Sequence, residues 1–149
     1  MKIACTFLLA ALALGGCAPR TGIVTANDAW CRATPPGAPA AGCFVTLTAS
    51  AADRLIGVES DAGASAEIHT MTMVDGVMRM RRLEQGVVLT SGRPAALKPG
   101  ADHLMIMGPK TPLVVGGTVG LKLLFEKAPP VTITAPVRAM AAPMQGVVH

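Results

Sequence analysis

Short runs that alternate between apolar and polar residues follow one another along this chain, and turn-forming residues separate them. Nine runs have the length and the two-residue period of β-strands: 22–30, 43–49, 54–60, 66–73, 77–83, 87–90, 103–107, 118–126 and 131–137. The connections between them are rich in Gly, Pro and Asp, as in PPGAP and KPGAD. Long amphipathic helical patterns are absent from the sequence. The pattern therefore predicts an all-β sandwich or barrel.

The N-terminus carries the features of a bacterial targeting segment. Lys2 precedes the apolar run IACTFLLAALAL, and small residues follow it up to Cys17. The four residues LGGC at 14–17 resemble a lipobox, in which the cysteine becomes the lipidated first residue; the alternative is an ordinary signal peptide cut elsewhere. We expect a signal peptide over 1–16 and a lipidated tether over 17–22. Pro19 stands where inner-membrane lipoproteins carry aspartate, which favours the outer membrane.

The remaining chain suits one domain. With 149 residues and 51% hydrophobic residues, the protein can bury a core, and we place the folded domain at 23–137 and a flexible tail at 138–149. After the targeting segment, no stretch is long and apolar enough to span a bilayer. The net charge is +4, the basic residues are scattered apart from RMRR at 79–82, and the chain has no Tyr and few other aromatic residues. These properties argue against nucleic acid as a partner.

Two cysteines remain once Cys5 is removed with the signal peptide and Cys17 carries lipid. Cys31 and Cys43 flank the turn-rich stretch RATPPGAPAAG. In an oxidising compartment a disulfide between them is the default expectation. The alternative is a redox-active or metal-binding pair. Their spacing is much wider than Cys-x-x-Cys, so we favour the disulfide.

One hairpin concentrates methionine. The sequence AEIHTMTMVDGVMRMRRL contains Asp75-Gly76, a strong two-residue turn signal. If these two residues form the loop, Val74 lies opposite Val77 and Met71 opposite Met80. One face of the hairpin would then carry His69, Met71, Met73, Met78 and Met80.

The stretch HLMIM repeats this composition at 103–107. In an extended strand, His103, Met105 and Met107 point to one face. Core packing explains any single methionine, because Met fills irregular gaps. It explains the set less well, because strands favour Val and Ile and because a histidine buried among methionines needs a partner. Thioether sulfur with imidazole selects Cu(I), whereas Zn(II) prefers thiolate or carboxylate and Ca(II) prefers hard oxygen ligands.

At these residues the sequence resembles the bacterial periplasmic copper chaperones of the PCu(A)C type. That family carries a His, ten residues, a Met, about twenty-one residues and then His-x-Met. Here His69 and Met80 enclose ten residues, and 22 residues, one more than usual, separate Met80 from His103-Leu104-Met105. The stretches DAWCRATPPGA, LKPGADHLMIMG and KTPL also match the style of the family. Cys31 and Cys43 stand where the family commonly has other residues.

The resemblance implies a cupredoxin-like, Greek-key β-sandwich. The implied metal ligands are His69, Met80, His103 and Met105. Met71, Met73, Met78 and Met107 become core residues or a soft secondary shell. Some relatives carry a Met/His-rich tail that binds a second copper. Met140, Met144 and His149 are a thin version of it, which would give at most a weaker second site that could take Cu(II).

The function implied is a chaperone anchored by lipid on the periplasmic face of a bacterial membrane. It would bind Cu(I) and deliver it to an acceptor such as the Cu(A) centre of cytochrome oxidase subunit II, or to Sco-like proteins. We expect no enzymatic activity. The alternatives are an electron-transfer cupredoxin, which needs a cysteine thiolate beside two histidines, and a metal-free β-sandwich lipoprotein. A hydrolase is least favoured, because the histidines lack an evident nucleophile.

Overall fold

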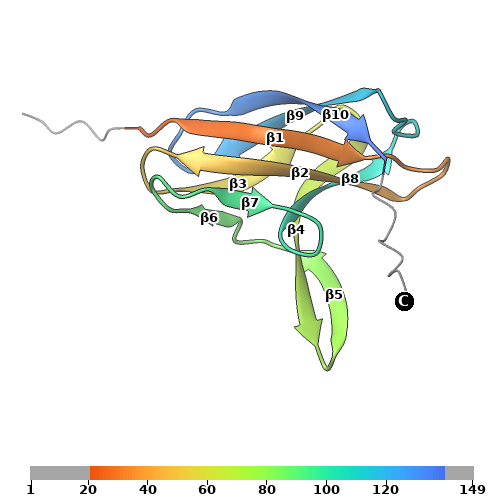
Figure 1. Ribbon diagram of the computed structural model, residues 1–149, viewed down its shortest axis with the longest axis horizontal. Helices are drawn as coiled ribbons and strands as arrows, with labels where there is room; N and C mark the ends of the chain where they lie inside the picture. Colours follow the sequence, from red (N-terminus) through yellow and green to blue (C-terminus); the bar gives the residue numbers. More distant parts are fainter. Residues whose placement is uncertain (1–20, 140–149) are drawn as a thin grey trace, which may run out of the picture.

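The structure is a computed structural model that describes residues 21–139. Every regular element within these residues is a β-strand (Figure 1). The strands are β1 Val24–Arg32, β2 Ala40–Ala49, β3 Asp53–Glu59, β4 Gly63–Val74, β5 Val77–Arg82, β6 Val87–Leu89, β7 Ala95–Leu97, β8 His103–Pro109, β9 Thr118–Phe125 and β10 Val131–Arg138. The expected all-β class is confirmed.

Two groups of strands form the sandwich. One group has the order β5-β4-β8-β2-β1, with β7 pairing with β2 next to β8, and the other has the order β10-β9-β3-β6. A short parallel pairing of β1 with β10 connects them, through Cys31 opposite Val137 and Arg32 opposite Arg138. All other pairings between these strands are antiparallel. Most of the chain between β1 and β10 thereby closes around one core.

The core follows the alternation in the sequence. In β9, Val119, Leu121 and Leu123 are buried while the residues between them are exposed or partly exposed. In β8 the same alternation sends Leu104 and Ile106 into the core cluster and leaves His103 and Met105 on the other face of the strand. Full burial of such a leucine or isoleucine side chain contributes about 1.5–3 kcal/mol. This packing holds β8 firmly between β4 and β2.

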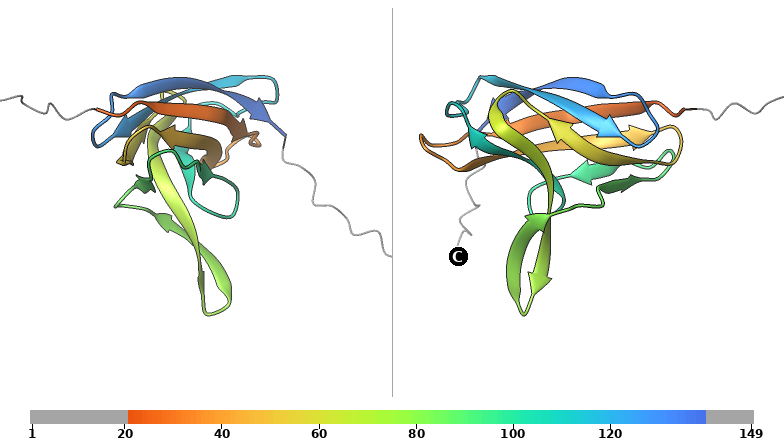
Figure 2. Two further views of the ribbon diagram at one scale, coloured as in Figure 1. Left: turned by 60° about the vertical axis from the view of Figure 1, so that its left-hand side comes forward. Right: turned by 180° about the vertical axis from the view of Figure 1, so that it is seen from behind.

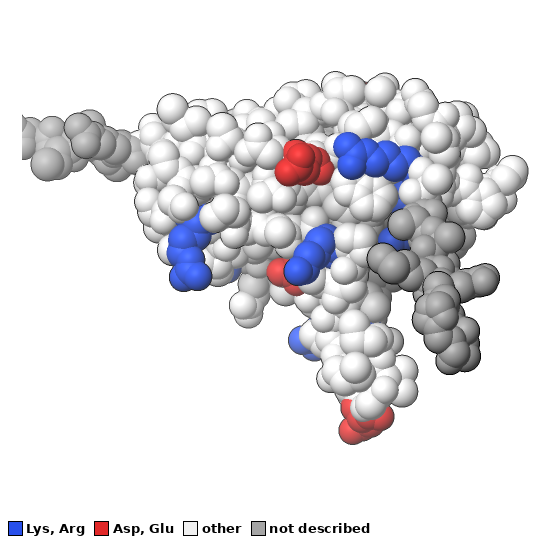
Figure 3. Space-filling model, in the orientation of Figure 1, with Lys and Arg blue, Asp and Glu red and all other residues white. Residues whose placement is uncertain are grey.

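The hairpin of β4 and β5 extends beyond the sandwich (Figure 2). Asp75 and Gly76 both have positive φ, 51° and 77°, as a two-residue type I′ turn requires. The register is the predicted one, with Val74 opposite Val77 and Met71 opposite Met80. Every residue of β5 is exposed. On the face drawn in Figure 3, charged side chains are sparse and an acidic group lies at the end of the hairpin, where Asp75 forms the turn.

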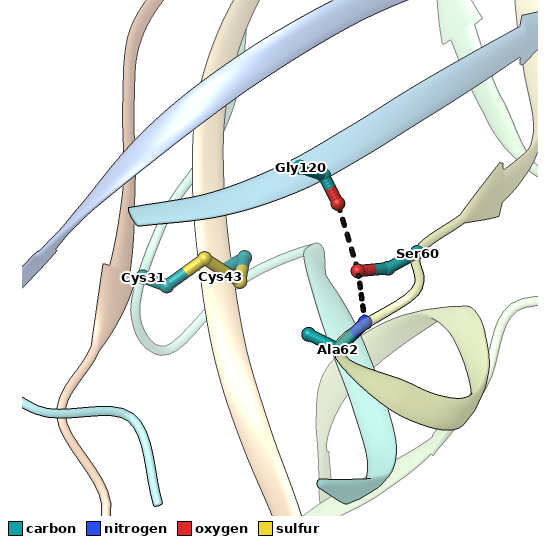
Figure 4. The surroundings of a disulfide bond; sticks show 5 residues. All are labelled: Cys31, Cys43, Ser60, Ala62 and Gly120. Carbon is teal, nitrogen blue, oxygen red and sulfur yellow. Dashed lines mark hydrogen bonds between the residues drawn. A yellow bond between two sulfur atoms is a disulfide. The ribbon is translucent and has the colours of Figure 1, made fainter. Parts of the chain in front are cut away.

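The predicted disulfide is present. Cys31 and Cys43 lie opposite each other in β1 and β2, both fully buried, with their sulfurs bonded at 1.99 Å (Figure 4). Nearby, the Ser60 hydroxyl donates to the Gly120 carbonyl at 2.8 Å and accepts from the Ala62 amide at 3.3 Å. These two bonds fasten the turn between β3 and β4 to β9.

The nine predicted strands correspond to nine of the ten strands observed. The prediction missed β7, because three residues of the sequence Ala-Ala-Leu carry little strand signal. The predicted signal peptide, the lipidation site Cys17 and the tail residues Met140, Met144 and His149 lie outside the described residues. Within 21–139 the structure contains no helix that could cross a membrane.

Candidate metal centre

Two histidines meet where β4 and β8 pair. His69 lies directly opposite His103 in the antiparallel register, and the centroids of their rings are 6.1 Å apart. His103 begins β8, immediately after the turn that leads from β7. Residues opposite each other in antiparallel strands point to the same face. The strand register therefore brings the two imidazoles together from positions 34 apart in the chain.

The backbone fixes the tautomer of His103. Its Nδ1 lies 2.8 Å from the Ala101 carbonyl oxygen, which can only accept, so Nδ1 carries the hydrogen and donates it. In the neutral ring, Nε2 then holds a lone pair. This Nε2 lies 3.1 Å from Met80 Sδ. A nitrogen lone pair and a thioether sulfur, neither of which has a hydrogen to share, thus face each other.

A carboxylate fixes the tautomer of His69 in the same way. His69 Nε2 donates to a Glu67 carboxylate oxygen at 2.8 Å. The lone pair is therefore on Nδ1, which is buried and finds no hydrogen-bond partner among the described residues. Buried nitrogens are seldom left unpaired without a reason. Histidines that bind metals typically donate their other ring hydrogen to a carboxylate or a backbone carbonyl, as both of these rings do.

An open hollow of ≈ 420 Å³ lies beside His103. Met71, Met80, His103 and Met105 form part of its lining, together with residues of the β1–β2 connection. Met105 lies two residues after His103 in β8, opposite Gly42 of β2 and Glu67 of β4. Sulfur atoms from three strands thus border one space that opens to solvent.

The structure brings together some of the predicted site residues and separates others. Three of the four predicted ligands, Met80, His103 and Met105, line the hollow together with Met71, and the fourth, His69, lies with its ring centroid 6.1 Å from that of His103. Met73 and Met78 pair near the end of the projecting hairpin and do not line the hollow, because each is further along its strand than Met71 or Met80. Met107 lies beyond Met105, opposite Ser65 and Ala40, and does not line it either.

Sequence reasoning missed the two groups that orient the rings. Glu67 precedes His69 by two residues, so strand alternation places it on the same face and could have identified it. Its carboxylate is also 3.5 Å from the Arg82 guanidinium. The Ala101 carbonyl could not have been identified, because its position depends on a turn in which Gly100 has φ of 80°.

The donor set is soft and largely neutral. Residues 21–139 contain no group of three or more His, Cys, Asp or Glu side chains arranged to hold a metal ion. A metal bound here would therefore rely on two imidazole nitrogens completed by thioether sulfurs. Such a set matches a soft monovalent ion better than Zn(II) or Ca(II).

Two aromatic side chains lie near His103. The ring of Phe44 is 6.2 Å from His103 and 4.5 Å from Trp30, measured between centroids. The guanidinium groups of Arg32 and Arg138 lie over Phe44 and Trp30, at 5.5 and 5.9 Å from the ring centroids. Trp30 is the only tryptophan of the chain. Its fluorescence can therefore report on events at the hollow.

Comparisons with known proteins identify the family of the chain. The sequence model of a protein family described as LpqE-like lipoproteins matches residues 24–137. A protein of Leifsonia xyli subsp. xyli (strain CTCB07), Lxx21020, also named as a lipoprotein, is 30% identical over 115 residues, which make up 77% of this chain and 69% of that protein.

Solved structures of similar fold include two that hold copper. The copper-bound PCuAC domain from PmoF2 is 28% identical, with a TM-score of 0.64 over 78% of this chain and 93% of that one. Cu(I)-bound DR1885 from Deinococcus radiodurans is 25% identical, with a TM-score of 0.59 over 84% of this chain and 83% of that one. The cupredoxin-like sandwich and the PCu(A)C resemblance are confirmed.

Proposed function

Because the chain belongs to the LpqE-like lipoprotein family, we propose that it is a lipid-anchored copper chaperone. It binds Cu(I) as cargo through His69, Met80, His103 and Met105 and releases it to an acceptor protein. The similarity to a copper-bound PCuAC domain supports copper as the metal. Binding and release need no chemical conversion, so the proposal assigns no enzymatic activity.

One observation carries the proposal. The lone pair of His103 Nε2 faces Met80 Sδ at 3.1 Å, and His69, whose Nδ1 is buried without a hydrogen-bond partner among the described residues, lies opposite His103 in the strand register. A buried nitrogen without a hydrogen bond is costly unless something binds it. A soft metal ion would bind both nitrogens and the sulfur without disturbing the hydrogen bonds to Glu67 and Ala101.

The ligand set supports the monovalent state of copper. Neutral thioethers and imidazoles stabilise Cu(I), and one of the similar solved structures, DR1885, is named in its Cu(I) form. The set contains no thiolate, so the ion remains exchangeable. Met80 is 49% exposed and the hollow is open, which gives a ligand of the acceptor a route to the metal. The acceptor would be the Cu(A) centre of cytochrome oxidase subunit II or a Sco-like protein.

The lipoprotein names of the family and of its relative support a membrane-anchored location. Lipidation at Cys17 would hold the sandwich at the periplasmic face of a bacterial membrane, the outer membrane in our proposal. The lipid would be the only contact with the membrane.

The geometry gives no support to electron transfer of the blue-copper type. That chemistry needs a cysteine thiolate on the metal. The two cysteines in the described part of the chain, Cys31 and Cys43, are bonded to each other. A metal-free binding role is distinguished from copper delivery by the Cu(I) titration described next, because a metal-free protein would not retain the ion.

The decisive experiment is an anaerobic titration of the mature protein with Cu(I) in competition with a Cu(I) chelator. X-ray absorption of the product then counts the neighbours of the metal. We expect one tightly held Cu(I) with nitrogen and sulfur ligands, and weaker binding in His69→Leu and His103→Leu. The proposal is contradicted if the protein loses all its copper to a weak chelator. It is also contradicted if the metal is bound through oxygen and nitrogen atoms alone.

A further inference from the structure

The end of the β4–β5 hairpin exposes two methionines that the proposed metal centre does not use. Met73 and Met78 lie opposite each other and are 63% and 44% exposed. We call them the tip pair. They lie on the same face of the hairpin as His69, whereas the opposite face carries Val74 and Val77 at the same level. At this level both faces are apolar and exposed, but further along the strands the opposite face carries Thr72 and Arg79, whereas the sulfur is all on the face that leads to the histidines.

Neither packing nor local structure explains the tip pair. Exposed side chains add little to the stability of the core, and methionine is a mediocre strand former. The turn is determined by Asp75 and Gly76, which adopt the required positive φ angles by themselves. A valine or threonine at position 73 or 78 would serve the hairpin better. The thioether groups themselves are therefore the property that distinguishes these positions.

The tip pair continues a regular ladder. Met73 faces Met78, Met71 faces Met80, and Met80 Sδ touches His103 Nε2 at 3.1 Å. Opposed side chains in an antiparallel pair have Cβ atoms about 4.5–5.5 Å apart, and a step of two residues along a strand is about 7 Å. Two sulfurs in one pair can therefore share a soft metal ion at about 2.3 Å each, by analogy with zinc–sulfur bonds. The flexible methionine side chain can reach across one step.

We propose that the tip pair is a weak, solvent-exposed thioether site for Cu(I) that loads the inner site through Met71 and Met80. This inference rests on the proposed copper-carrying function. At each step a new copper–sulfur bond forms as an older one breaks, and copper remains Cu(I), so no electron is transferred. The affinity for Cu(I) increases from the two thioethers of the tip pair to the thioethers and two imidazoles of the inner site. Cu(I) therefore moves inward spontaneously and stays there.

The first test separates the rate of loading from the affinity. The variant Met73→Leu/Met78→Leu keeps apolar side chains of similar volume and removes both sulfurs. Its uptake of Cu(I) from an excess of a weak Cu(I) chelator is followed by stopped flow, and its affinity by competition at equilibrium. We expect uptake to be slower by about tenfold, equivalent to about 1.4 kcal/mol in the activation barrier. The equilibrium affinity should stay within about twofold of the wild type.

Two control variants match the change. Val74→Thr/Val77→Thr alters the opposite face at the same level of the hairpin, and Met107→Leu removes a thioether that does not line the hollow. Both should load at the wild-type rate. Unchanged uptake by the tip-pair variant overturns the inference and leaves the copper-carrying function standing. A parallel loss of affinity also overturns it, since the pair would then act as ligands of the inner site. A wild-type chain that binds no Cu(I) overturns both.

A second measurement does not depend on kinetics. Protein labelled with ¹³C in the methionine methyl groups is titrated anaerobically with Cu(I). We expect the Met80 and Met105 signals to shift with the first equivalent, and the Met73 and Met78 signals to shift only with a further, weakly bound equivalent. Signals of the tip pair that remain fixed in excess Cu(I), while those of Met80 move, contradict the inference.

Discussion

His69 and His103 lie directly opposite each other across β4 and β8, and each ring donates one hydrogen to a fixed acceptor. The acceptors differ: one is the Glu67 carboxylate and the other is the Ala101 carbonyl. In both rings the remaining nitrogen therefore carries a lone pair, and that of His103 faces Met80 Sδ at 3.1 Å. The two imidazoles are thus oriented before any metal arrives, which lowers the free-energy cost of binding one.

Met105 and Met107 allow a matched test of the ligand assignment. Both lie in β8, but Met105 lines the hollow and Met107 does not. Leucine conserves the volume, so each substitution should cost less than about 1.5 kcal/mol of stability. We expect Met105→Leu to weaken Cu(I) binding about tenfold or more, the effect of losing about 1.4 kcal/mol of binding free energy. Met107→Leu should bind like the wild type. Equal affinities, measured by chelator competition, would remove Met105 from the site.

Glu67 should act on copper binding without touching the metal. Glu67→Ala removes the acceptor that orients His69, and such outer partners typically contribute about 10–100-fold in metal affinity. Glu67→Gln retains an oxygen acceptor and should recover part of the loss. The control is Glu59→Ala, which breaks the exposed pair with Lys122. If Glu67→Ala and Glu59→Ala bind Cu(I) equally well, then Glu67 has no positioning role.

Strand alternation and turn chemistry are sufficient to predict most of the fold. Asp75-Gly76 determines the register of the hairpin because a type I′ turn admits one pairing, and that pairing places Met71 opposite Met80. The pairing of β4 with β8 is not predictable in this way. These strands are joined through a long connection, and their register depends on the packing of Leu104 and Ile106 in the core.

The candidate site, like the fold, is predictable from the sequence only in part. The residue types and their spacing indicate His69, Met80, His103 and Met105, whereas the direction of each ring depends on Glu67 and on the turn before β8. The extension of the hairpin beyond the sandwich is also hidden from the sequence. Because of it, Met73 and Met78 do not line the hollow, and since Met107 lies further along β8, only Met71 of the four expected secondary-shell methionines does. Exposed and buried methionines look alike in a one-dimensional pattern.

The disulfide should stabilise the fold without taking part in metal binding. Cys31 and Cys43 close a loop with a sequence separation of 12, which in the chain-entropy model contributes about 3 kcal/mol. Cys31→Ala/Cys43→Ala should therefore unfold at a lower urea concentration than the wild type. Its Cu(I) stoichiometry should stay the same, because neither cysteine lines the hollow. Loss of copper binding in a variant that remains folded by circular dichroism would point to thiolate ligation instead.

Asp53 should make stability depend on pH in the acid range. Burial raises the pKa of its carboxyl, but hydrogen bonds from the backbone amides of Arg54, Ala128 and Lys127, with the Lys127 charge, outweigh burial and hold the pKa below its ordinary value. A pKa lower in the folded state stabilises the fold above the unfolded-state value of about 3.9, and this stabilisation is lost as pH falls through the folded value.

The variant Asp53→Asn tests this contribution. The side-chain NH₂ group of the asparagine would face a backbone N–H that in the wild type donates to the Asp53 carboxylate. One unsatisfied donor of this kind costs about 1–3 kcal/mol. Urea denaturation at pH 7, 5 and 3 should therefore show the variant to be less stable at pH 7 and pH 5. The difference should shrink at pH 3, because below about 3.9 the unfolded wild-type chain takes up a proton at this carboxyl more readily than the folded chain does, which lowers its free energy of unfolding. A difference that stays constant down to pH 3 would mean that the carboxylate charge contributes nothing and that the amide merely fits the loop poorly.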